Sequence, residues 1–153
     1  MASTAAFPDL TQRPPRSPRV RLGGFVLLPR ILDKGRADHA GVLGEYRFSG
    51  KGMDRHFLAF TGLTFDALKA EIATGKGDGE MLAWVLANAP LQRLPWEIDA
   101  WSNYLERRTP DGDVETLTDF AEAVGKFAQN REDIHTWFDL LDLDDHCTFG
   151  GRP

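Results

Sequence analysis

Short stretches with apolar residues at helical spacing, separated by glycine, proline and aspartate turns, dominate the sequence. Leu94, Ile98 and Trp101, for example, recur every three or four residues, so they share one face of a helix until the turn at 109–112. Asp54, Thr64 and Asp78 are the expected N-caps of three such stretches. The same pattern predicts helices over 29–41, 54–62, 65–75, 78–89, 94–108, 116–130 and 131–143.

This organisation predicts an all-α fold. Segment 42–50 alternates weakly, so it allows one short strand or hairpin at most. At 153 residues with 42% hydrophobic content, the chain is long enough for one domain with its own core. We therefore expect a single irregular bundle of about six short helices over residues 20–153.

Residues 1–19 are expected to form an extended arm rich in proline and arginine. Proline fixes its own backbone and disfavours helix at the preceding residue, so "RPPRSPR" stays extended. Arg13, Arg16 and Arg19 recur every third residue, which is the period of a polyproline helix and would place them along one edge. An arm of this kind can present the three arginines together to an acidic surface.

The charge is divided unevenly along the chain. Residues 1–60 contain ten Lys or Arg and five Asp or Glu, a balance of +5, whereas residues 61–153 contain eight and eighteen, a balance of −10. The arm is therefore expected to dock on an acidic face of its own chain or of a neighbouring subunit. Its expected partners are Asp142, Asp144 and Asp145. Nucleic acid is an unlikely partner because the acidic body repels phosphates.

This interpretation makes the protein a non-enzymatic binding or assembly module that forms a homo-oligomer. Trp96 begins a helix outside its apolar stripe, so it is expected to border a cleft or an interface.

A second interpretation is an enzyme or a binding protein for an anionic small molecule. In the first helix, Arg30, Lys34 and Arg36 would hold a phosphate or a carboxylate, and Asp33 would orient them. His39 or Glu45 would transfer a proton. No nucleophile and base stand at a recognisable spacing, so the reaction class stays open.

Several classes of site find no support in the sequence. It contains no G-x-x-x-x-G-K-[ST], G-x-S-x-G or H-E-x-x-H motif, and Cys147 is its single cysteine. The acidic stretch 139–147 lacks the glycine and glutamate of a calcium loop. Neither a metal nor a cofactor is therefore predicted. The sequence shows no long apolar run and no secretory signal. We therefore expect a cytoplasmic protein with no membrane association.

Several motifs together resemble those of a known family. They are "DLTQRPPRSPRVRLGGFVLLPRILDKGRA", "GEY", "GKGDGEMLAWV", "TWFDLLDLDD" and "FGG". In this combination the chain resembles, over nearly its whole length, a family of small bacterial proteins known as domain of unknown function 5069. The resemblance implies no activity, substrate, cofactor or catalytic residue.

Overall fold

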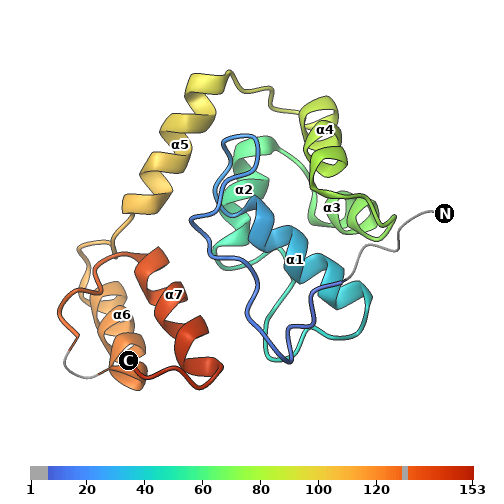
Figure 1. Ribbon diagram of the computed structural model, residues 1–153. Coiled ribbons are helices and arrows are strands. Elements are labelled where there is room, and N and C mark those ends of the chain that lie inside the picture. The colour runs from blue at the N-terminus through green and yellow to red at the C-terminus, as the bar shows by residue number, and fades with distance from the viewer. Residues whose placement is uncertain (1–6, 129–130) are drawn as a thin grey trace.

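The computed structural model describes residues 7–128 and 131–153, and within them it contains seven helices and no strand (Figure 1). The prediction of an all-α fold is therefore confirmed. The helices are α1 (Leu28–His39), α2 (Asp54–Thr61), α3 (Phe65–Ile72), α4 (Asp78–Asn88), α5 (Pro95–Arg107), α6 (Val114–Phe127) and α7 (Trp137–Thr148).

The helix ends follow local chemistry. Thr64 caps α3, because its side chain accepts a hydrogen bond from the amide of Ala67, and Thr136 caps α7 in the same way through Asp139. α2 ends at Gly62, which adopts a left-handed conformation with φ of 76°. Pro29 lies in the first turn of α1, where a missing backbone N–H costs no hydrogen bond.

Several details of the sequence prediction differ from the structure. The helix expected over 131–143 is α7, which begins at Trp137 and continues to Thr148. Asp54 and Asp78 lie inside the first turns of α2 and α4 instead of capping them, because their carboxylates are engaged in ion pairs with other elements. Segment 42–50 is a loop, and the extended pairing in the described part of the chain is one isolated bridge between Leu22 and Phe25. The helix expected over 116–130 ends at Phe127, and positions 129–130 lie outside the described residues.

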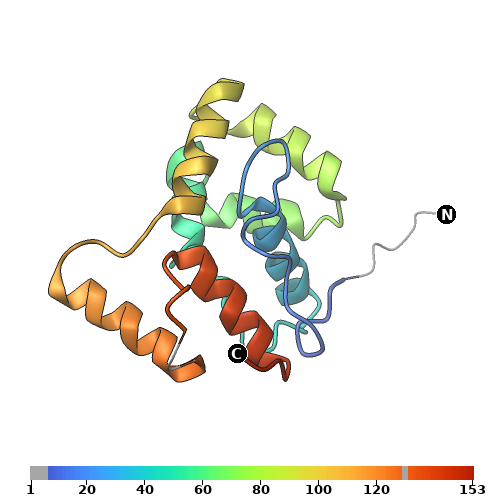
Figure 2. The same ribbon diagram turned by 60° about the vertical axis from the view of Figure 1, so that its left-hand side comes forward.

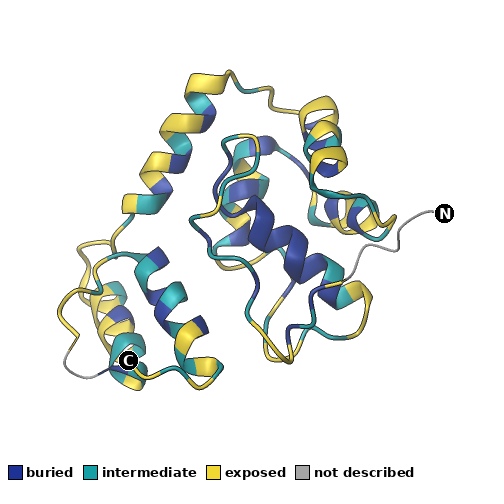
Figure 3. Ribbon diagram, in the orientation of Figure 1, coloured by how far each residue is buried: buried dark blue, intermediate teal, exposed yellow. Residues whose placement is uncertain are grey.

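α1 occupies the centre of the molecule and is buried on nearly every side (Figure 3). Nine of its twelve residues are buried, including the apolar Leu28, Ile31 and Leu32. Gly35 lets α3 approach closely, since a Cβ at this position would lie 2.7 Å from the Cδ1 of Ile72. Helices α2, α3, α4, α5 and α7 supply apolar side chains to the core around α1.

An aromatic cluster joins α2 and α5 to the segment before α1. The rings of Phe60 and Trp101 are stacked with centroids 4.6 Å apart, and Phe25 meets both Phe57 and Trp101 edge-on. These contacts explain why the aromatic residues at helical spacing belong to the core.

α6 and α7 pack together beside this core (Figure 2). Phe120 of α6 meets Trp137 of α7 edge-on, with the ring centroids 5.0 Å apart. α7 also contacts α5, and Phe138 reaches the main core. α7 therefore connects the α6 pair to the rest of the molecule.

The described part of the N-terminal arm, residues 7–19, contains no helix or strand and lies against the body of the protein. Apolar residues of the arm are buried with it, namely Pro8, Leu10, Pro15 and Pro18. The backbone turns at Asp9, whose carbonyl accepts hydrogen bonds from the amides of Gln12 and Arg13. Arg16 pairs with α1 and α4, whereas Arg19 pairs with α7, so these two arginines do not meet a single acidic face.

A substitution at Gly44 should destabilise the fold. Gly44 has φ of 64°, and a Cβ there would lie 2.8 Å from the carbonyl oxygen of Leu10. Gly44→Ala is expected to lower the free energy of unfolding by at least about 1 kcal/mol, measured by urea denaturation.

The matched control is Gly79→Ala. Gly79 is helical, and a Cβ there meets no atom within 4 Å. This substitution should be neutral or stabilise the protein by up to about 1 kcal/mol. Equal effects of the two substitutions would contradict the close approach of arm and loop at Gly44.

Candidate functional site

Four of the five charged side chains of α1 are buried or nearly buried. Arg30, Asp33 and Lys34 are less than 10% exposed, and the side chain of Arg36 is 11% exposed. A buried charge is stable only with a partner, so each must find a counter-ion on a neighbouring element. The partners come from the arm, α2, α4 and α7.

Arg30 forms a buried two-pronged pair with Asp145 of α7. Its two terminal nitrogens donate to the two carboxylate oxygens over 2.7 and 3.1 Å. The hydroxyl of Tyr46 donates to the same carboxylate over 2.8 Å, and the Tyr46 ring lies 5.7 Å from the guanidinium carbon of Arg30. Burial and this hydrogen bond raise the pKa of Tyr46, so the phenol stays protonated.

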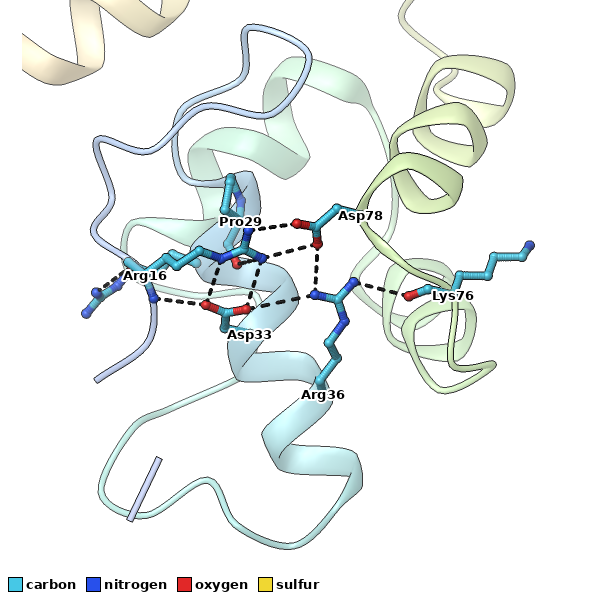
Figure 4. Close-up of polar contacts among 7 residues, drawn as sticks. Arg16, Pro29, Asp33, Arg36, Lys76 and Asp78 are labelled. Carbon is cyan, nitrogen blue, oxygen red and sulfur yellow. Dashed lines mark hydrogen bonds and ion pairs between the residues drawn. The ribbon is translucent and has the colours of Figure 1, made fainter. Parts of the chain in front are cut away.

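Asp33 and Arg36 belong to a second network, which reaches the arm and α4 (Figure 4). The side chain of Arg16 in the arm donates two hydrogen bonds of 3.0 Å to Asp33 and two of 2.7 and 3.1 Å to Asp78. Arg36 donates to Asp78 over 2.9 Å and to the carbonyl oxygen of Lys76 over 3.1 Å. The hydrogen bonds from Arg16 hold the pKa of Asp78 below its ordinary value. Arg16 therefore links the arm to two helices.

Lys34 pairs with Asp54 of α2 over 2.6 Å, and both side chains are nearly buried. Burial lowers the pKa of Lys34, although the adjacent carboxylate of Asp54 opposes this effect.

Arg19 of the arm pairs with α7. It contacts Asp139, and its Nε donates to Asp142 over 3.0 Å. The hydroxyl of Ser17 also donates to Asp142, over 2.7 Å. Asp139, Asp142 and Asp145 are three residues apart along α7, so their carboxylates lie on one side of the helix and meet the arm and α1.

A cavity of about 390 Å³ lies between α1, the loop over 43–53 and α7. This volume is within the range of small-molecule sites. Charged side chains dominate its lining: Arg30, Lys34, Arg47 and Lys51 are cationic, and Glu45, Asp54 and Asp144 are anionic.

The cavity brings together some of the residues predicted as a ligand site and leaves out others. Arg30, Lys34 and Glu45 line it. Asp33 and Arg36 instead belong to the network with Arg16.

The other predicted residues lie apart. His39 is exposed at the end of α1, with its ring 6.2 Å from that of Phe7. Arg13 is exposed and takes part in no ion pair found among the described residues. Asp144 lines the cavity and accepts a hydrogen bond from Thr148 instead of meeting the arm.

Five residues of the site were not singled out by the sequence. They are Tyr46, Arg47, Lys51, Asp54 and Asp78. No local pattern identifies the two aspartates as ion-pair partners, because an aspartate at the start of a helix fits an N-cap equally well. For the other three, a signal was available in the glycine-rich loop "GEYRFSGKG", where basic and aromatic residues alternate with turn residues.

Other candidate sites are weaker. Hollows at the end of α5 (103–111) and on α6 (114–122) are lined mainly by exposed side chains. Across residues 7–128 and 131–153, no three His, Cys, Asp or Glu side chains are gathered where they could hold a metal ion. No helix in the same part of the chain is long and apolar enough to span a membrane.

Fold and site together define a small helical protein in which a charged central helix borders a cavity. The sequence from residue 12 to 147 matches the family described as Domain of unknown function (DUF5069), so the chain belongs to this family. A comparison with curated proteins finds no match.

Removal of Arg30 should expose the cost of an unpaired buried charge. Arg30→Met leaves Asp145 without its counter-ion and is expected to lower the free energy of unfolding by about 3–5 kcal/mol in urea denaturation. The double variant Arg30→Met/Asp145→Leu removes both charges and should recover most of this loss. A double variant less stable than the single one would contradict this account of the pair.

Proposed function

We propose that this protein binds a small anionic molecule, carrying a phosphate or a carboxylate, in the cavity between α1, the loop over 43–53 and α7. One observation carries the proposal. Arg47 and Lys51 line the cavity and are exposed, and neither takes part in an ion pair found among the described residues. Their charges are available to a ligand.

In this proposal the arm has a structural role. Arg16 and Arg19 are already matched by aspartates of the same chain. An arm held in this way supports docking within one subunit, and it leaves these two arginines unavailable to the phosphates of a nucleic acid. We also place the protein in the cytoplasm, where the thiol of Cys147 stays reduced.

Arg30 does not serve as a test residue, because its loss disturbs the fold through Asp145. The test uses Arg47→Gln and Lys51→Gln, which remove exposed charges, and calorimetric titration of each protein with inorganic phosphate, pyrophosphate and citrate. One of these anions is expected to bind the wild type, and each variant should bind it at least about tenfold more weakly.

The matched control is Lys126→Gln, which removes an exposed charge from α6. Its affinity should equal that of the wild type. The proposal fails if none of the anions binds, or if the control weakens binding as much as the two cavity variants.

Self-association is a second candidate function, supported by exposed apolar side chains around the connection from α4 to α5. Leu86, Leu91, Leu94 and Trp96 are 44–68% exposed. Large apolar residues exposed close together in sequence are typical of protein interfaces. A second copy of the chain is the proposed partner.

Native mass spectrometry of the full-length protein tests this candidate. We expect an oligomer for the wild type and a monomer for Leu94→Ser/Trp96→Ser. Val114→Ser on α6, whose side chain is 79% exposed, is the control and should leave the oligomer intact. A wild-type monomer would exclude self-association as the function.

A further inference from the structure

We propose that Lys34 is a nucleophilic amine that forms an imine with an aldehyde or ketone carrying an anionic group. This inference rests on the proposed function, since it assigns the substrate class of the same cavity. It concerns a residue that both pairs with a buried aspartate and lines the cavity.

The position of Lys34 supports this role. Its side chain lines the cavity and is 11% exposed, and its amine pairs with Asp54, which lines the same cavity. Arg47 and Lys51 lie on the loop that forms another wall of the cavity. A phosphate or carboxylate held by these two cations would place a carbonyl group of the same molecule within the cavity that Lys34 borders.

The surroundings of Lys34 increase the fraction of its amine that is neutral. Burial lowers the pKa of the amine, and the positive charge of nearby Arg30 lowers it further, against the opposing effects of Asp54 and Asp145. Of a lysine with an ordinary pKa, only about 0.1% is neutral at pH 7.5, and each unit by which the pKa falls raises this fraction about tenfold.

Asp54 supplies the proton transfers that imine formation needs. The neutral amine of Lys34 attacks the carbonyl carbon, so that a C–N bond forms while the π bond of the C=O group breaks. The carboxylate of Asp54, 2.6 Å from Nζ, accepts one proton from the nitrogen and passes it to the oxygen, which becomes a hydroxyl. The second proton of the nitrogen follows the same route to the hydroxyl, which leaves as water while the C=N bond forms. Both protons of the amine end in the water molecule, so atoms and charges balance without an oxidant or a metal.

The experiment uses the folded full-length protein and pyridoxal 5′-phosphate, an aldehyde that carries a phosphate, at pH 7.5. Borohydride fixes any imine, and peptide mass spectrometry then measures labelling at each of the five lysines, Lys34, Lys51, Lys69, Lys76 and Lys126. Access alone makes Lys34 the slowest site, because it is the most buried of them. We expect instead that Lys34 is labelled at least about tenfold faster than any other lysine.

Two matched comparisons sharpen the result. Pyridoxal, which lacks the phosphate, should label Lys34 more slowly than pyridoxal 5′-phosphate does, and Arg47→Gln should abolish this difference. Lys34→Arg retains a positive charge beside Asp54 and should remove the labelled peptide, whereas Lys69→Arg should leave labelling of Lys34 unchanged.

Wild-type labelling alone decides the inference, even if Lys34→Arg does not fold. An unlabelled Lys34 in a protein that binds inorganic phosphate overturns this inference and leaves the proposed function intact. Equal labelling of Lys34 by pyridoxal and pyridoxal 5′-phosphate overturns the anionic substrate class. Preferential labelling of Lys34 that inorganic phosphate suppresses, while labelling of the other lysines is unchanged, supports both the proposed function and this inference.

Discussion

The burial of α1 together with four of its five charged side chains determines how the rest of the molecule is arranged. A helix in the core is normally apolar on all sides, but this one needs a counter-ion in each direction in which a charge points. The arm, α2, α4 and α7 each bring an aspartate or an arginine to it. These ion pairs fix the position of each neighbouring element around α1, whereas apolar contacts alone would let that element slide along the helix.

Such pairs contribute specificity more than net stability. Removing two charges from water offsets most of their mutual attraction, whereas losing one partner leaves the other buried alone. The packing around α1 also constrains the backbone of Leu27, the residue before the helix. Its φ is 70°, an unfavourable value for a residue with a side chain, and it is held there by full burial and by a hydrogen bond from its amide to the carbonyl of Pro18. This residue also lines the cavity, so the strained turn shapes the candidate site.

Local patterns were sufficient to predict the helical fold, because apolar spacing and the glycine and proline signals act within a few residues. The pairing of charges was not predictable in the same way. The sequence predicts that Arg30 is available to a ligand, since an arginine is rarely buried, and its buried partner Asp145 lies 115 positions away in the chain. The spacing of Asp139, Asp142 and Asp145 was a visible sign that one side of α7 meets cations. The cavity depends on the loop over 43–53, whose course follows from tertiary packing.

The contacts between the arm and α7 also bear on how the chain is made. Ser17 and Asp142, which are joined by a hydrogen bond, are 125 positions apart in the sequence, and Arg30 and its partner Asp145 are 115 positions apart. During synthesis α1 is made long before α7, so Arg30 has no counter-ion until α7 follows. The native contacts of Arg30 are therefore completed only after α7 has been made, and until then this apolar, charged helix stays exposed to chaperones.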